Sequence, residues 1–292
     1  MTEPAGWLYY RVYLADLPEI RTLVEQVVAP TMRRLTAERP GLRWFFLQYV
    51  DPLGVHLRLR LHTPLSGISA YETVFDEAFA VALDHLRAHS GPTAGQMSRM
   101  VAKRLYEPEY EKFGGPEGVA LAERIMQRGS EAALACAHPG VRPLRTTVGA
   151  AHTDLLVRRL PPEAQLSFLH QYAWYWSGRA RSDTPWQPPV PVLDPSDPAA
   201  VRRAHRLRVL MDESLEDPYV GPALTHYTAD FWRLVHTAER SRRDYLTAFH
   251  HIHLMNNRLG IVPGEEVQIA RLLWLERLTG GRARTDTKGQ AA

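Results

Sequence analysis

Two arginines and two histidines alternate with apolar residues over residues 55–62, which read VHLRLRLH. A period of two is typical of a β-strand, so we expect the basic side chains on one face and the apolar ones on the core face. Arg58 and Arg60 would then form a rigid pair of guanidinium groups that can bind an anion, provided that this face lines a cleft. The competing interpretation is a solvated sheet face, which is the usual fate of a row of charges.

A histidine-rich segment, residues 250–260 (HHIHLMNNRLG), lies near the end of a predicted helix. Helical spacing places His250, His253 and Asn257 on one side. This pair of histidines lacks a third ligand and the HExxH spacing, so no metal site is predicted. Because histidine titrates near neutral pH, a histidine held by an asparagine is a candidate general base, and a structural role is the alternative.

Two further segments combine aromatic and polar residues. Residues 106–115 (YEPEYEKFGG) end in a glycine pair, which predicts a structured turn. Glu109 and Lys112 lie three residues apart there and could form an ion pair, either at the surface or within a charged cleft. Residues 170–176 (HQYAWYW) hold more rings than one helix face can bury, so we assign most of them to the core and some to a possible peptide groove.

Hydrophobic spacing predicts the elements that must position these residues. The N-terminal part alternates strands and helices, with a hairpin turn at 51–54, over residues 7–14, 17–35, 44–50, 55–62, 69–88 and 96–106. This β-α-β-β-α-β order indicates an α+β fold with a ferredoxin-like antiparallel sheet.

Helical spacing dominates after the break at Gly114-Gly115-Pro116, in residues 117–136, 144–158, 162–177, 200–215, 222–241 and 243–258. We therefore predict a ferredoxin-like part at residues 1–114 and a helical part at 115–279 packed on it. The proline-rich segment 185–198 is expected to be an ordered loop or a linker, and residues 280–292 a disordered tail.

Composition indicates a globular protein, with 45% hydrophobic and 23% charged residues. No apolar run approaches the ~18 residues of a membrane span, and no secretory signal is recognisable. The single cysteine, Cys136, excludes an internal disulfide and fits a cytoplasmic setting. Because 35 Lys and Arg barely exceed 32 Asp and Glu, and the basic clusters at 202–208 and 240–243 suit solvated helix faces, the charge is weak evidence for nucleic-acid binding.

Five motifs, in this order, resemble the C-terminal domain of class I lanthipeptide dehydratases, which also occurs as free-standing proteins in thiopeptide clusters: WLYYRVYL, WFFLQYVDP, HLRLRL, YEPEYEKFGG and HIHLMNNRLG. The likeness extends from about Trp7 to about Leu278. Each motif is loose by itself, whereas their order and spacing over most of the chain are fairly specific.

The resemblance implies an enzyme that eliminates glutamate from glutamylated serine or threonine residues, leaving dehydroalanine or dehydrobutyrine. It implies two partners: a precursor peptide with a leader, and a separate protein that glutamylates this peptide from glutamyl-tRNA. We expect no cofactor, no direct contact with nucleic acid and no membrane association. The sequence does not indicate the oligomeric state.

By position, the family's strand arginines match Arg58 and Arg60, its motif glutamate matches Glu109 and its histidine matches His253. Lys112 stands where the family usually has arginine, which keeps the charge but loses the bidentate fork.

The difficult step of such an elimination is removal of the weakly acidic Cα proton, which needs a positioned base and stabilisation of the enolate-like charge. We predict His253 as the base and Arg58 or Arg60 as the group that holds the departing carboxylate or the enolate oxygen. Glu109 is expected to bind the glutamyl ammonium or to orient an arginine, with His56 and His62 as supports.

Two other functions remain open. Free-standing relatives of this fold perform a formal (4+2) cycloaddition between two dehydroalanines, which gives the thiopeptide pyridine and expels the leader; Lys112 and the aromatic residues 172–176 are compatible with it. A module that only binds the leader peptide is the second, because an exposed sheet edge can add a peptide strand.

Overall fold

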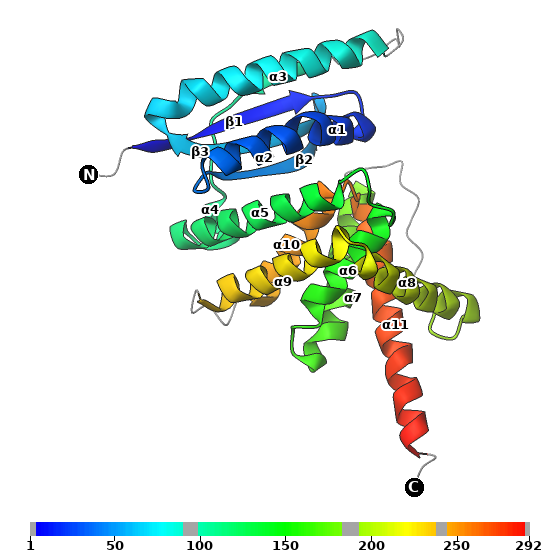
Figure 1. Ribbon diagram of the computed structural model, residues 1–292. Helices are drawn as coiled ribbons and strands as arrows, with labels where there is room; N and C mark the ends of the chain where they lie inside the picture. Colours follow the sequence, from blue (N-terminus) through cyan, green and yellow to red (C-terminus); the bar gives the residue numbers. More distant parts are fainter. Residues whose placement is uncertain (1–3, 90–98, 183–192, 238–243, 290–292) are drawn as a thin grey trace. The chain divides into compact units, whose positions relative to one another are not determined.

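The computed structural model describes residues 4–89, 99–182, 193–237 and 244–289 (Figure 1). The chain forms two compact units, Met1–His138 and Pro139–Ala292. The first contains the sheet and the second is helical, so the predicted α+β class is confirmed. The boundary lies later than the predicted one after residue 114, because the helix that follows this point packs on the sheet.

Four antiparallel strands make the sheet, in the order β2-β3-β1-β4. Their bounds are β1 Ala5–Tyr13, β2 Arg43–Asp51, β3 Gly54–Pro64 and β4 Met100–Lys103. This is the predicted ferredoxin-like order. Gly54 closes the β2–β3 hairpin with a φ of 121°, a conformation that side chains other than glycine rarely adopt. Strand β4 is shorter than predicted, and residues 96–98 of that prediction lie outside the described residues.

Helices cover the apolar face of the sheet: α1 Leu17–Leu23, α2 Ala29–Glu38 and α3 Ile68–His89. Leu57, Leu59 and Leu61 of β3 are fully buried beneath them. The predicted helix 17–35 is interrupted by a π-helical turn, η1 Val24–Val28, directly before Pro30. Proline has no N–H and clashes with the preceding turn, so a wider turn accommodates it.

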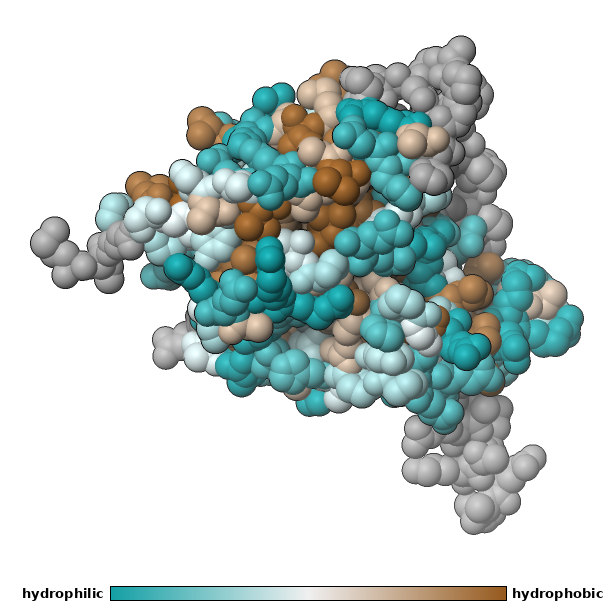
Figure 2. All heavy atoms as spheres, turned by 45° about the horizontal axis from the view of Figure 1, so that its top comes forward, coloured by the Kyte–Doolittle hydropathy of each residue, from teal (hydrophilic) through white to brown (hydrophobic). Residues whose placement is uncertain are grey.

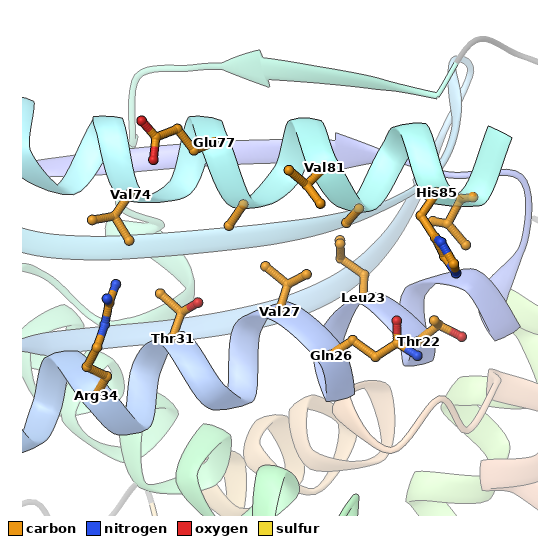
Figure 3. A pocket seen from close by; sticks show the side chains of 13 residues that line it. Thr22, Leu23, Gln26, Val27, Thr31, Arg34, Val74, Glu77, Val81 and His85 are labelled. Atoms are coloured by element: carbon orange, nitrogen blue, oxygen red, sulfur yellow. The ribbon is translucent and has the colours of Figure 1, made fainter. Parts of the chain in front are cut away.

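A groove of about 630 Å³ separates α3 from the α1–α2 segment (Figure 3). Apolar side chains such as Leu23, Val27 and Val74 line it together with Glu77 and His85. Figure 2 brings the α3 side of Figure 1 forward and shows apolar surface gathered among polar side chains there.

Two helices complete the first unit, α4 Tyr110–Phe113 and α5 Pro116–Cys136. Gly114 and Gly115 join them with φ values of 79° and 94°, which confirms a structured turn at the glycine pair. Helix α5 lies along the edge strand β2, where the Phe46 N–H donates to Ser130 Oγ at 3.1 Å. An edge strand covered in this way offers fewer unpaired backbone groups to another chain.

The second unit contains six helices among its described residues: α6 Arg145–Val157, α7 Pro162–Ser182, α8 Pro198–Glu216, α9 Val220–Thr237, α10 Asp244–Arg258 and α11 Pro263–Gly289. The helical segments predicted between 144 and 258 are thus confirmed wherever the chain is described. Most of the proline-rich segment and the end of the predicted helix 222–241 lie outside the described residues.

Helix α11 continues into the segment from Gly280, for which the sequence predicts disorder, and ends at Gly289. Extending an existing helix needs no new nucleus, so a segment with little to bury can remain helical. No described helix is both long and apolar enough to cross a membrane.

A buried carboxylate joins three helices of the second unit. Asp154 of α6, with 3% of its side chain exposed, binds Arg208 of α8 at 2.7 Å and Arg277 of α11 at 2.5 Å. Arg158 adds a third contact at 2.7 Å. Opposite charges surround this carboxylate, which offsets the cost of removing it from water.

His152, two residues before Asp154, predicts how the stability of the protein depends on pH. The ring is fully buried, and burial together with the nearby Arg258 lowers the pKa of His152 from 6.5 to about 3. Between these two values the unfolded chain binds a proton that the folded chain does not. The contribution of His152 to the free energy of unfolding should therefore fall by about 1.4 kcal/mol per pH unit between pH 6.5 and about 3.

Urea unfolding between pH 4 and 8 measures this dependence. His152→Phe should flatten the curve below pH 6.5, whereas the same change at His226, whose side chain is 76% exposed, should leave it unaltered. An unchanged slope in His152→Phe would contradict the assignment.

Candidate functional site

The basic face of β3 is covered by aromatic rings rather than by water. In the sheet register Arg60 lies opposite Tyr9 of β1 and Phe45 of β2, and Arg58 lies opposite Leu47 and Arg11. Alternation along three neighbouring strands therefore brings these side chains to one face. The face is thus only partly solvated: His56 and Arg60 are buried, whereas Arg58 and His62 are half-buried.

Arg60 lies inside an aromatic box. Its guanidinium carbon is 4.4 Å from the ring centroid of Tyr9, 5.1 Å from that of Phe45 and 5.0 Å from that of Tyr106. Only 7% of the residue is exposed, and burial lowers the pKa of Arg60. Its Nε has no hydrogen-bond partner, and no carboxylate of the described residues forms an ion pair with it.

Arg58 is held by a different pair of contacts. Its guanidinium carbon lies 3.4 Å from the centroid of the Tyr49 ring, and its Nε donates to His56 Nε2 at 3.0 Å. Because arginine can only donate, this contact assigns the proton of His56 to Nδ1, which lies 3.2 Å from the Gly54 carbonyl oxygen. Burial lowers the pKa of His56, in agreement with a neutral ring. His56 thus acts as a support for Arg58, as predicted.

A buried acid lies beside the aromatic box. Glu123 of α5 is 8% exposed and 3.9 Å from Arg43, and it accepts a hydrogen bond from Tyr106. Burial raises the pKa of the Glu123 carboxyl and that of the Tyr106 hydroxyl. Arg43 also contacts the ring of His62, 2.7 Å from its Nδ1, so His62 contacts Arg43 rather than Arg58 or Arg60. The sequence analysis did not single out Glu123, which stands within a regular helical pattern.

Glu109 and Lys112 do form an ion pair, with 2.8 Å between carboxylate and ammonium. Their side chains are 59% and 36% exposed, so the pair is a surface pair at the start of α4. Exposed pairs of this kind contribute ~0–1 kcal/mol to stability. The negative charge of Glu109 nevertheless raises the pKa of Arg60, as one of the weaker influences on that pKa.

His253 belongs to a second cluster, in the helical unit. Its Nδ1 lies 2.9 Å from Glu266 Oε1, and its ring stacks on Trp176 with 3.8 Å between centroids and 21° between planes. Glu266 is completely buried and accepts two further hydrogen bonds at Oε2, a short one from the Tyr172 hydroxyl and one of 3.2 Å from Asn256. A quarter of the His253 side chain is exposed.

The partners of His253 differ from the predicted one. Glu266 and Asn256 hold the cluster, whereas Asn257 was the predicted partner. Glu266 follows only after the helix ends at Arg258 and the chain turns at Gly260, so helical spacing could not pair the two residues. Tyr172 and Trp176 lie inside the predicted aromatic segment and are buried, while Trp174 is 72% exposed.

The described residues contain no group of three or more His, Cys, Asp or Glu side chains that could hold a metal ion. The first unit contains a pair of guanidinium groups among aromatic rings, and the second contains an imidazole bound to a carboxylate. The first can bind an anion and the second can exchange a proton.

A family model described as lantibiotic biosynthesis dehydratase C-term matches residues 7–276. The chain belongs to this family. The match spans both units and includes all five predicted site residues. No protein among the curated ones matches the sequence.

Three solved structures share the fold at low identity. The tRNA dependent lantibiotic dehydratase MibB from Microbispora sp. 107891 is 18% identical over 97% of this chain, with a TM-score of 0.56, and the chain spans only 29% of MibB. The pyridine synthase TbtD from thiomuracin biosynthesis is 16% identical over 94% of this chain and 99% of its own, with a TM-score of 0.62. TsrL is 18% identical over 94% of this chain and 95% of its own, with a TM-score of 0.57. The printed names of the similar structures include a dehydratase and a pyridine synthase, so this fold occurs in proteins with more than one activity.

The unpaired guanidinium of Arg60 predicts an unusual stability effect. Replacing a buried charge that has no counter-ion by an apolar side chain of similar volume removes a desolvation cost, and such changes can stabilise a fold by ~1–4 kcal/mol. Arg60→Met should therefore leave the free energy of unfolding unchanged or raise it, as measured by urea denaturation.

Arg99 provides the matched control, since it is equally buried but bound to Glu19, with 2.9 Å between Nε and Oε2. Arg99→Met removes the guanidinium from Glu19, whose side chain is 13% exposed and still accepts the Ala15 N–H, and should lower the free energy of unfolding. If Arg60→Met and Arg99→Met lowered the free energy of unfolding equally, Arg60 would be a structural residue.

Proposed function

We propose that this protein eliminates glutamate from glutamylated serine or threonine residues of a precursor peptide. The observation that supports this most is the buried guanidinium of Arg60, which forms no ion pair with a carboxylate of the described residues. A ligand that supplies the missing counter-ion gains an interaction in a site of low dielectric constant. The departing glutamate is a carboxylate and satisfies this requirement.

The elimination assigns one task to each cluster. The neutral imidazole of His253 takes the Cα proton, the electrons of that C–H bond form the Cα=Cβ double bond, and the Cβ–O ester bond breaks. Glutamate leaves as a carboxylate and the proton stays on His253 until water removes it. Arg60 and Arg58 donate hydrogen bonds to the departing carboxylate or to the carbonyl oxygen that becomes enolate-like.

Arg58 suits this task because its contacts hold it without using all of its donors. Its side-chain hydrogen bond to the described residues uses Nε alone, so both terminal nitrogens remain for a ligand. Tyr49 and His56 fix the plane of the guanidinium. A preorganised donor loses little entropy when an anion arrives.

Glu109 is assigned to the ammonium group of the glutamyl ester. Its present partner, Lys112, is exposed, and exchanging one surface cation for another costs little. Lys112, released from this pair, could then contact an anion as a single charge rather than as a fork.

A pyridine-forming (4+2) cyclase is the second candidate. TbtD matches this chain over 99% of its own length, whereas the chain covers 29% of MibB. The rings around Arg60 and the stacked pair of Trp176 and His253 also provide flat surfaces for an unsaturated peptide. For either reaction the partner is a precursor peptide with a leader; for elimination a separate glutamylating protein must supply the ester.

Elimination predicts distinct losses in two variants. With a chemically prepared glutamylated peptide, Arg60→Ala should lower the single-turnover rate by ~10²–10³, the usual effect of removing a donor to developing charge. His253→Ala should abolish detectable turnover because no base remains. Mass spectrometry of the peptide measures the loss of glutamate, and Arg87→Ala and His226→Ala serve as controls because both side chains are largely exposed.

A dehydroalanine-containing peptide distinguishes elimination from cyclisation. If this peptide loses its leader and gains a pyridine, while the glutamylated peptide stays intact, the protein is a cyclase and not an eliminating enzyme. Binding of both peptides without any turnover would identify a leader-binding module instead. Unchanged elimination in Arg60→Ala and His253→Ala would remove both residues from the proposed machinery.

A further inference from the structure

We infer that Glu266 is a positioning residue which fixes His253 in a single tautomer. The hydrogen bond from the Tyr172 hydroxyl weakens the electrostatic effect of the Glu266 carboxylate on the imidazole. This inference rests on the proposed role of His253 as the base. Neither Glu266 nor Tyr172 touches the reacting atoms in the proposed mechanism, so both would act through His253.

The geometry defines the tautomer. The carboxylate of Glu266 can only accept, so the nitrogen 2.9 Å away, Nδ1 of His253, must carry the proton. The neutral ring then has its lone pair on Nε2, which forms no hydrogen bond to the described residues. A base must present a lone pair to its substrate, and in this tautomer the exposed part of the ring can do so.

Packing leaves the carboxylate no alternative orientation. Glu266 is completely buried in the first turn of α11, and its two oxygens face donors from two other helices. Oε1 faces His253 of α10, and Oε2 faces Tyr172 of α7 and Asn256 of α10. Among the described residues these are the titratable and polar side chains in contact with the carboxylate. Trp176 covers one face of the imidazole and contributes no charge.

Tyr172 remains the donor in its contact with Glu266. Burial and the neighbouring carboxylate raise the pKa of this phenol well above its ordinary value, so the proton stays on Tyr172. Its hydrogen bond withdraws charge from the carboxylate. Without it, Glu266 would attract the proton on His253 more strongly.

The two residues should therefore have opposite effects on the same histidine. Glu266→Gln keeps an acceptor near Nδ1 but removes the negative charge, so the ring should protonate at lower pH. Tyr172→Phe leaves more charge on Glu266, so the ring should protonate at higher pH. A purely structural role would not produce shifts of opposite sign.

Glu265 offers a matched control on the same turn of α11. Its carboxylate binds Arg145, with 2.7 Å between Nη1 and Oε2, and its side chain is 29% exposed. Glu265→Gln removes the same charge from the adjacent position without contacting His253. The His253 ring should titrate as in the unaltered protein.

NMR of the free protein with ¹⁵N-labelled histidine tests the inference without any reaction. The His253 ring should show the Nδ1–H tautomer when neutral. Its titration midpoint should move down by about one pH unit in Glu266→Gln and up in Tyr172→Phe, with no change in Glu265→Gln. An Nε2–H tautomer, or shifts of the same sign in both variants, would overturn the inference.

Turnover separates this inference from the proposed function. If His253 is the base, the acidic limb of the pH–rate profile should follow the NMR midpoints, and Glu266→Gln should lower kcat by at least ~10-fold with KM nearly unchanged, as for an oriented base that loses its partner. If NMR gives the expected tautomer and shifts but His253→Ala still turns over, the positioning stands and the role of His253 as base fails. If the profile does not follow the NMR midpoints, Glu266 does not act through His253 in the reaction.

Discussion

A buried guanidinium without a counter-ion is the constraint on which the first unit depends. Removing a charge from water is costly, and three aromatic rings around Arg60 compensate for only part of that cost. The ferredoxin-like sheet makes the arrangement possible, because β3 is a central strand whose neighbours each contribute rings at the matching register. The apolar face of the same strand packs under α1, α2 and α3 and so holds the basic face in place. This cost is the basis of the proposal that Arg60 binds an anion.

In the second unit the buried charges have partners, in contrast to Arg60 in the first unit. The carboxylate of Glu266 is satisfied by three donors, and Asp154 is surrounded by arginines. Such hydrogen-bond networks fix the orientation of side chains and leave no buried charge that needs a ligand as its partner. The contacts of His253 fix one tautomer of its ring. In the proposed elimination this histidine would act as the base, and the guanidinium of Arg60 would bind the anion.

Local patterns in the sequence predicted the elements well because each has a clear period. Alternation in VHLRLRLH identified β3, and the order of strands and helices identified the sheet topology. The boundary between the units was predicted too early, since nothing in the helical period of α5 indicates that Ser130 binds the β2 backbone. The burial of Arg60 and the pairing of His253 with Glu266 depend on neighbours from other strands and helices, which a one-dimensional pattern does not contain.

The most direct test of the anion receptor is a comparison of binding in a protein that cannot turn over. Calorimetry with His253→Ala should give a tighter dissociation constant for free glutamate, which carries the departing carboxylate, than for its diamide, which has no carboxylate, by ~10-fold or more if one charge-assisted hydrogen bond of ~1.5–3 kcal/mol is made. Adding Arg60→Met should abolish that preference while leaving the affinity for the diamide unchanged. Equal preference in the two proteins would contradict the role of Arg60 as the receptor.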